Sequence, residues 1–310
     1  MARIGITLGD PSGIGPEIVR AACDGGDDLV VYGDAILCAG VAAELVPVTS
    51  LDGLVPGTPT DATGRAQVAY LETAVADARA GKLDALVTAP IHKASCLAAG
   101  FAFPGHTEFL QARLGAGAVT MMFAGPRMRV SLATIHHALA DVPRVLSAEA
   151  IAVAIAQTAE ALVADFGIVA PRIAVAGLNP HAGEQGHFGD DERRVIAPAI
   201  DVARTRLAAA GIDATLDGPR VPDAVFRDHL DGRFDAVVAM YHDQGLIPVK
   251  LVDFEEAVNV TLGLPIVRTS PDHGVAHDIA GKRRARPTSF AAALRLARQI
   301  LARHPPMNKE

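Results

Sequence analysis

Short runs of small and β-branched apolar residues alternate with longer amphipathic segments along most of the chain. The runs Ala85–Thr88 and Ala236–Ala239 are apolar at nearly every position, which is typical of strands buried on both faces of a parallel sheet. Between such runs, Gln67–Arg79 and the stretch from Ser147 to Ala164 place apolar residues at helical spacing. This alternation predicts α/β layers around a mostly parallel sheet.

Further elements follow from the same pattern. Strands are predicted at Arg3–Leu8, Leu29–Tyr32, Arg172–Gly177 and Ala257–Thr261. An antiparallel pair is predicted from Thr120–Phe123 and Met128–Thr134, which flank a short turn. Residues 46–64, rich in Pro, Gly, Thr and Asp, predict an irregular surface connection. Pro198 should interrupt a helix that begins near Asp190, and Thr288 or Ser289 should cap a closing helix.

Composition narrows the class of protein. The 310 residues are 50% hydrophobic but only 4% aromatic, so the core must be built from Ala, Val, Leu and Ile. A net charge of −7 argues against nucleic acid as the main partner, because binding it needs a basic face. No stretch approaches the roughly 20 apolar residues of a membrane span, and the first residues predict a strand and no signal peptide. No membrane partner is therefore expected.

The three cysteines, Cys23, Cys38 and Cys96, match no metal-binding or disulfide spacing. Reduced thiols buried in the core of a cytoplasmic protein are the simplest interpretation.

Histidines follow the predicted strands repeatedly. His136, His181 and His242 each come shortly after a strand. Three neutral imidazoles with coordination positions left over would make a catalytic divalent-metal site. Any one of them alone is more simply a hydrogen-bonded loop histidine, and spacing does not rank His136 over His137, nor His181 over His187.

The stretch Met240–Lys250 concentrates this chemistry directly after a buried strand. Open α/β sheets bind ligands at the carboxyl ends of their strands, so this segment is expected to form a strand-end loop beside a ligand. His242 and Asp243 could serve a metal or a proton. Lys250, placed after a turn at Gly245 and Pro248, could meet an anion.

A second set of residues suits a phosphate group. His106 and Thr107 open a predicted helix, and Lys250, Asn259 and Arg268 add an ammonium, an amide and a guanidinium. Taken separately, Arg268 could equally form a surface ion pair and Asn259 could cap a strand end.

Two glycine-containing loops remain. Gly9–Ile18 is neither a dinucleotide-binding GxGxxG fingerprint nor a Walker P-loop. Pro271–Lys282 holds two glycines, two aspartates and two histidines, and it could form an adenine and ribose site or a tight surface loop.

Long motifs in order along nearly the whole chain resemble the 4-hydroxythreonine-4-phosphate dehydrogenase family of pyridoxal phosphate biosynthesis. The motifs are GDPSGIGPEI from Gly9, TAPIHK from Thr88, FPGHTEFL from Phe103, LATIHHAL from Leu132, GLNPHAGEQGHFG from Gly177, GPRVPDAVF from Gly218, MYHDQGLIPVK from Met240, NVTLGLPIVRTSPDHG from Asn259 and DIAGK from Asp278.

The resemblance implies two α/β/α domains around a central cleft, with a mostly parallel sheet, as in the isocitrate and isopropylmalate dehydrogenases. The first domain is expected to span residues 1–115 and 262–310 and to carry the cofactor loop. The second is expected to span 116–261 and to carry the metal ligands and the dimer interface.

The resemblance also implies roles for individual residues. His136, His181 and His242 would bind a divalent metal (zinc, magnesium or cobalt) in a site shared across a homodimer, and Asp243 joins them as a catalytic candidate. The expected substrate-binding residues are His106, Thr107, Lys250, Asn259, Arg268 and Asp223. His273, Gly274 and Asp278 would hold NAD or NADP.

The implied reaction is oxidation of 4-phosphohydroxy-L-threonine at C3, followed by decarboxylation to 3-amino-2-oxopropyl phosphate. The metal would favour the C3 alkoxide, so that hydride passes to the nicotinamide. A dehydrogenase for 4-phosphothreonate or 4-phosphoerythronate is the alternative within the family. A metal-dependent phosphohydrolase and a non-catalytic phosphometabolite-binding protein are alternatives of other classes.

The chain departs from the family pattern at a few positions. His92 stands where Asn usually follows API, Val275 stands where Thr usually follows DHG, and His137 with Ala138 replaces an apolar residue and a proline. Arg283, Arg284 and Arg286 make the loop after AGK more basic than usual.

Overall fold

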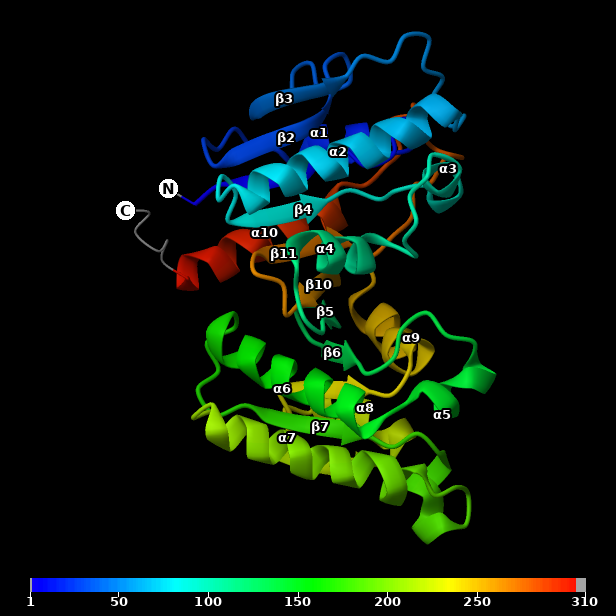
Figure 1. The fold of residues 1–310 in the computed structure, drawn as a ribbon, viewed down its shortest axis with the longest axis vertical. Coiled ribbons are helices and arrows are strands. Elements are labelled where there is room, and N and C mark those ends of the chain that lie inside the picture. The colour runs from blue at the N-terminus through cyan, green and yellow to red at the C-terminus, as the bar shows by residue number, and fades with distance from the viewer. Residues whose placement is uncertain (1, 305–310) are drawn as a thin grey trace. The chain divides into compact units, whose positions relative to one another are not determined.

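The computed structural model describes residues 2–304, which divide into two compact units (Figure 1). One unit holds the chain as far as Gly117 together with the described residues from Leu264 onward, and the other is Ala118–Gly263. Among the described residues, no helix is long and apolar enough to cross a membrane.

The first unit is built on five parallel strands in the order β3-β2-β1-β4-β11. The strands are β1 (Ile4–Thr7), β2 (Leu29–Asp34), β3 (Glu44–Thr49), β4 (Ala85–Thr88) and β11 (Val267–Pro271). Its helices are α1 (Gly15–Ala22), α2 (Asp61–Arg79), α3 (Lys93–Ala98), α4 (His106–Leu114) and α10 (Thr288–Arg303). Helix α2 packs along β1 to β4, and α10 packs against β4 and β11.

The prediction of an irregular connection at 46–64 is wrong at both of its ends, where the structure has a strand and the start of a helix. Residues 44–49 form β3, which pairs with β2 alone at the sheet edge. The strand was not predicted because it contains Pro47, and proline is tolerated in a strand only at a sheet edge. Helix α2 begins at Asp61, where Thr60 and Thr63 cap the helix reciprocally through their hydroxyl groups.

The second unit contains six strands in the order β10-β5-β6-β9-β7-β8. They are β5 (Thr120–Ala124), β6 (Arg129–Leu132), β7 (Arg172–Ala176), β8 (Thr215–Arg220), β9 (Ala236–Ala239) and β10 (Val258–Leu262). Strand β5 is antiparallel to β6 and to β10, and the other pairs are parallel. The prediction of a mostly parallel α/β sheet with an antiparallel pair is confirmed.

Helices cover both faces of this second sheet. They are α5 (Val142–Val145), α6 (Ala148–Ala164), α7 (Ala197–Ala209), α8 (Pro222–Leu230) and α9 (His242–Asp253), with short 3-10 segments at Leu139–Asp141 and Pro180–Gly186 and a π-helical turn at Glu192–Ile196. Pro198 lies in the first turn of α7, so it ends the π turn and leaves α7 uninterrupted. Thr288 is the first residue of α10 and not its cap.

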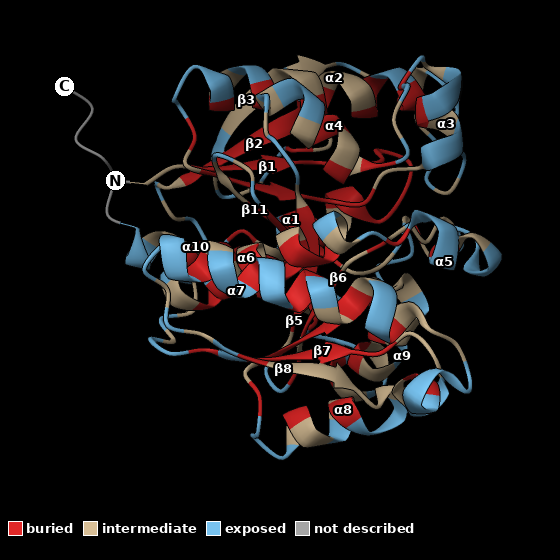
Figure 2. Ribbon diagram, turned by 60° about the horizontal axis from the view of Figure 1, so that its bottom comes forward, coloured by how far each residue is buried: buried red, intermediate tan, exposed pale blue. Residues whose placement is uncertain are grey.

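Strand β9 shows why a central strand is apolar at every position. Ala236 and Val238 pack into the core layer that α6 and α7 complete, whereas Val237 and Ala239 pack into the layer beneath α8 and α9. Most strands are accordingly buried along their length, with β3 and β8 as exceptions, and exposed positions lie on the outer faces of the helices (Figure 2). Most polar side chains are therefore placed at the strand ends.

The segment after β9 differs from the expected loop. Helix α9 begins at His242 and runs through Gly245 and Pro248. Gly245 allows the helix to lie directly on the sheet, because an added Cβ would sit 2.6 Å from Leu132 Cδ2 and 3.0 Å from Val130 Cγ1. The glycine that indicated a turn is thus required for close packing.

Gly245→Val should lower the free energy of unfolding by about 1–3 kcal/mol, because the added side chain overpacks the contact between α9 and β6. Urea unfolding followed by circular dichroism measures this change. Gly117→Val is the matched control, because no atom lies within 4 Å of a Cβ placed there. Equal stability of the two variants would contradict the packing role of Gly245.

His229 is a buried histidine of α8 that must be neutral. Its Nε2 accepts a hydrogen bond from the Arg129 backbone N–H at 3.0 Å, and its Nδ1 contacts the Phe234 carbonyl oxygen at 2.8 Å. Burial lowers the pKa of His229 below its usual value of 6.5. Because an Nε2 that accepts a hydrogen bond carries no proton, Nδ1 is the donor.

This lowered pKa predicts a pH-dependent stability. The unfolded chain takes up the His229 proton at a higher pH than the folded chain, so the stabilisation is complete above about pH 6.5 and is lost as the pH falls toward the folded-state pKa. Unfolding free energies measured between pH 7.5 and 5 should fall less steeply in His229→Gln than in the unchanged protein. Parallel curves would show that His229 does not titrate as described.

Candidate active site

Two of the expected metal ligands come together in the second unit. His136 follows β6 and His242 follows β9, and these strands are parallel neighbours, so their carboxyl ends lie at one edge of the sheet. The Thr134 hydroxyl donates to the Met240 carbonyl oxygen at 2.7 Å and ties the two segments together. The rings of His136 and His242 then lie 6.0 Å apart, centre to centre.

The residues after His242 orient it. Its Nδ1 lies 2.7 Å from the Asp243 carboxylate, which leaves Nε2 as the nitrogen available to a metal. A carboxylate on the second ring nitrogen is the usual way in which a ligand histidine is oriented. Gln244 accepts from the Met240 N–H at 2.6 Å and donates to the Gly177 carbonyl at 2.7 Å, so it joins the ends of β9 and β7.

His181 lies on a strained turn after β7. His181, Ala182, Glu184 and Gln185 all have positive φ values, between 42° and 57°, which non-glycine residues adopt at a cost of about 1 kcal/mol or more each. The side chain of His181 is exposed and its ring lies 6.0 Å from that of Phe188. Such strain persists only where surrounding contacts maintain it.

Glu192, which the sequence did not single out, maintains this turn. Its carboxylate is buried and accepts hydrogen bonds from the backbone N–H groups of Leu178 and Asn179 at 2.8 and 2.7 Å. The Asn179 side-chain amide also donates to Glu192, at 3.0 Å, and to Asp191. The only signal in the sequence was an acidic residue in the first helical turn after a glycine-rich loop.

The three imidazoles suit a divalent metal, but within one chain they do not all lie close enough together to bind the same ion. Among residues 2–304, His136, His181 and His242 do not bring their ring nitrogens within 4.8 Å of one another as a group. Within one chain, the 6.0 Å pair of His136 and His242 is therefore the part of the set that the structure assembles.

Part of the expected anion set lies in the first unit. Arg268, on β11, is 2% exposed and its Nη2 donates to the Thr88 hydroxyl at 2.8 Å. His106 and the buried Thr107 begin α4. Burial lowers the pKa of Arg268 to about 10. Burial, followed by the charges of Arg268 and Lys93, lowers the pKa of His106 well below its usual value, and its buried Nε2 has no hydrogen-bond partner among the described residues.

These features suit a bound anion. A buried imidazole nitrogen without a hydrogen-bond partner is costly, and a phosphate bound beside the Arg268 guanidinium would satisfy it.

The other members of the set lie in the second unit. Lys250 is on α9 and Asn259 is on β10, and the buried Oδ1 of Asn259 has no hydrogen-bond partner within the described part of the chain. Asp223 is exposed in the first turn of α8.

The expected cofactor loop packs against the first glycine-containing loop. The Ile14 N–H donates to the Val275 carbonyl at 3.0 Å, and a Cβ on Gly13 would lie 2.7 Å from that same oxygen. Within the cofactor loop, the buried Nε2 of His273 lacks a partner among the described residues, and no atom lies near a Cβ placed on Gly274. Asp278 is exposed. A polar atom without a partner beside open space fits a cofactor site.

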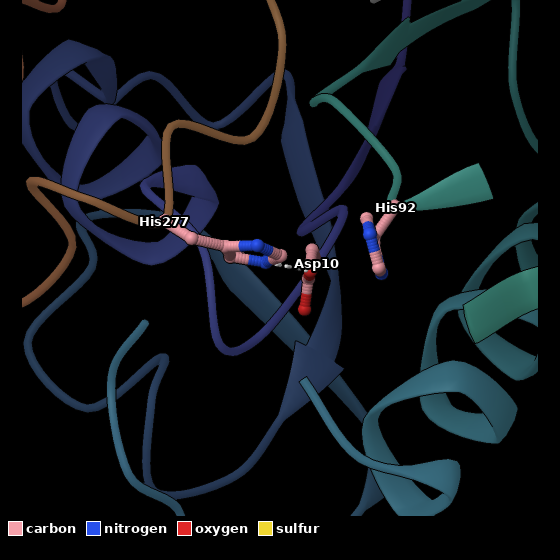
Figure 3. Close-up of side chains that lie close together, drawn as sticks. All are labelled: Asp10, His92 and His277. Atoms are coloured by element: carbon pink, nitrogen blue, oxygen red, sulfur yellow. Dashed lines mark hydrogen bonds and ion pairs between the residues drawn. The ribbon is translucent and has the colours of Figure 1, made fainter. Parts of the chain in front are cut away.

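The structure also assembles a cluster that the sequence did not indicate. Asp10, His92 and His277 offer one ligand atom each, and these atoms all lie within 4.8 Å of one another (Figure 3). All three residues belong to the first unit.

Comparisons with known proteins agree with the motifs. The profile of the family described as "Pyridoxal phosphate biosynthetic protein PdxA" matches residues 31–297. A 4-hydroxythreonine-4-phosphate dehydrogenase from Desulfosudis oleivorans is 49% identical over 95% of this chain and 94% of its own length. One from Caulobacter vibrioides is 45% identical over 97% of this chain and 98% of its own.

Solved structures show the same relationship. The crystal structure of 4-hydroxythreonine-4-phosphate dehydrogenase from Klebsiella pneumoniae superposes with a TM-score of 0.83 at 36% identity, and it covers 97% of this chain and 99% of that one. Isocitrate dehydrogenase from Methylococcus capsulatus, at 18% identity and a TM-score of 0.51 over 97% of this chain and 86% of that one, shares the fold, which confirms the predicted fold class. The strand-end histidines and the two packed loops thus lie in a chain that belongs to the pyridoxal phosphate biosynthetic protein PdxA family.

Proposed function

We propose that this chain oxidises 4-phosphohydroxy-L-threonine at C3 with NAD or NADP and a divalent metal, and that the product decarboxylates to 3-amino-2-oxopropyl phosphate. The observation that carries the proposal is the pair His136 and His242, 6.0 Å apart at one sheet edge, with Asp243 on the Nδ1 of His242. Curated relatives at 42–49% identity are named for dehydrogenation of 4-hydroxythreonine 4-phosphate.

The metal would be held by His136 and His242 of one chain and by His181 of a second copy. Pairing of the first two within one chain supports this division, because the third imidazole does not join their cluster. The strained turn at His181 would present the ring outward to the other copy. A bound zinc, magnesium or cobalt ion would supply Lewis-acid polarisation of the hydroxyl and carbonyl oxygen at C3.

The chain's own residues position the substrate. His106, Thr107, Arg268, Lys250 and Asn259 bind its phosphate, and Asp223 lies beside the substrate. Partnerless buried atoms on His106 and Asn259 support this assignment. Asp243 keeps the His242 ring in the tautomer with its proton on Nδ1, so it is an orienting group and no proton carrier.

The cofactor would lie along His273, Gly274 and Asp278. The free buried nitrogen of His273 and the open space at Gly274 support a ligand there. We also place the protein in the cytoplasm, because Cys23, Cys38 and Cys96 are buried free thiols.

NADH formation over a panel of phosphorylated hydroxy acids tests the proposal. 4-Phosphohydroxy-L-threonine should give NADH and carbon dioxide, and a chelator should stop turnover until a divalent ion is restored. Turnover only with 4-phosphothreonate or 4-phosphoerythronate, which lack the amino group, would replace the proposed substrate.

His181→Ala should abolish NADH formation, by about 10³-fold or more, because a metal site that loses one of three ligands cannot hold the ion in place. Thermal unfolding should be unchanged, because the His181 side chain is exposed. His187→Ala, on the same turn, is the matched control. Retained turnover in His181→Ala would remove His181 from the site.

The homodimer would form along α9. Ile247, Leu251 and Phe254 are exposed by 67%, 84% and 72% and recur at spacings of four and three residues, so they form one apolar stripe on the helix that begins with His242. Solvent-exposed apolar patches of this kind mark interaction surfaces. Burying the stripe against a second copy would bring that copy close to His242.

Leu251→Asp combined with Phe254→Glu should convert the dimer to a monomer, because burial of two carboxylates in an apolar contact is unfavourable. Light scattering coupled to size-exclusion chromatography measures the mass. Val169→Asp, at an apolar residue that is 86% exposed outside α9, is the control. A double variant that stays dimeric would place the interface elsewhere.

A further inference from the structure

Three residues that follow strands of the first unit lie close together, as His136 and His242 do in the second unit. Asp10 follows β1, His92 follows β4 and His277 lies in the loop after β11. Strands β1, β4 and β11 are parallel neighbours, so their carboxyl ends open at the same sheet edge. Figure 3 shows the His277 imidazole pointing toward Asp10, with the His92 ring on the other side of this carboxylate.

The carboxylate at the centre of this cluster is fully buried. Asp10 is 0% exposed, and its Oδ1 accepts from the Ser12 N–H at 2.9 Å and the Ser12 hydroxyl at 2.7 Å. Its Oδ2 lies 2.7 Å from His277 Nε2. A buried carboxylate is stable only where cations or hydrogen bonds compensate its charge, and Oδ2 faces the centre of the cluster.

The two imidazoles are oriented by neighbours outside the cluster. His92 Nδ1 lies 2.6 Å from the Ser95 hydroxyl, which leaves its Nε2 available, and its backbone N–H is fixed by the Gln67 side chain at 2.7 Å. The rings of His92 and His277 lie 4.8 Å apart, nearly edge to face. Ser12 and Ser95 therefore act as outer partners of the carboxylate and of one ring, as metal sites require.

We propose that Asp10, His92 and His277 form a second divalent-metal site, selective for a transition ion such as zinc, cobalt or nickel. One carboxylate and two imidazoles favour these ions over magnesium or calcium, which prefer oxygen ligands alone. Ligand atoms around a tetrahedral ion lie about 3.3 Å apart when bound at about 2.0–2.1 Å. The ligand atoms lie within 4.8 Å of one another, so binding requires small side-chain movements, and Asp10 Oδ2 and His277 Nε2, now 2.7 Å apart, separate slightly as the ion replaces the proton between them.

The site would join three segments, one of which carries the expected cofactor residues. Asp10 belongs to the Gly9–Ile18 loop, His277 to the Pro271–Lys282 loop and His92 to the start of α3. Cys96 lies outside the cluster, and its thiol donates to the Gln67 side-chain oxygen at 3.4 Å.

This site shares no residue with the three-histidine site, so the ion bound to it can be counted by removing its ligands alone. Equilibrium dialysis of the chelator-treated full chain against Co²⁺, with visible absorption of the bound ion as a second readout, gives the stoichiometry. His92→Asn and His277→Gln should each bind one equivalent fewer than the unchanged protein. His242→Gln should retain that equivalent, so failure of the proposed catalytic site would leave this result intact.

The variants are chosen so that a folding defect does not imitate the result. Asn is the residue that the family usually carries at position 92, so His92→Asn should fold, and thermal unfolding without metal checks it. His304→Gln, on an exposed histidine at the end of α10, is the matched control and should bind as the unchanged protein does. Unchanged stoichiometry and absorption in both His92→Asn and His277→Gln would overturn the proposal.

Discussion

Burial of the central strands, such as β1, β4 and β9, on both faces is the constraint on which the arrangement of this protein depends. Ala236 and Val238 serve one core layer and Val237 and Ala239 the other, so no polar side chain can be placed along β9. The candidate metal ligands consequently lie at the carboxyl ends, where parallel neighbours bring side chains from distant segments together. His136 with His242, and Asp10 with His92 and His277, are two results of this one rule.

Hydrogen bonds from neighbouring residues hold these strand-end segments in place. Thr134 and Gln244 each connect two strand-end segments, and Glu192 connects the segment after β7 to the π-helical turn before α7, through hydrogen bonds of 2.6–2.8 Å. Glu192 in particular maintains a run of residues with positive φ at His181. The close approach of α9 at Gly245 then fixes where His242 begins its helix.

Much of this could be predicted from the sequence, because strand and helix periodicities differ and motifs are local. The strand Ala236–Ala239 was predicted where the structure has it, and the helical pattern from Ser147 to Ala164 corresponds to α6. The edge strand with Pro47 and the helix through Gly245 and Pro248 were not predicted. Proline and glycine usually interrupt such elements, but here tertiary contacts outweigh this local preference. Strands β8 and β11 and helix α8 were not predicted either. The cluster at Asp10 joins residues as much as 267 positions apart, which no local pattern reveals.

The proposed metal site takes its ligands from two chains. A mixed dimer of two inactive variants tests this sharing most directly. Co-expression of His181→Ala and His242→Ala chains with different tags allows the mixed dimer to be purified, and its rate of NADH formation is compared with that of each parent dimer. A shared site predicts one intact site of two and about half of the unchanged activity, because a two-fold dimer holds two equivalent sites. A mixed dimer as inactive as its parents would show that each chain builds its site alone.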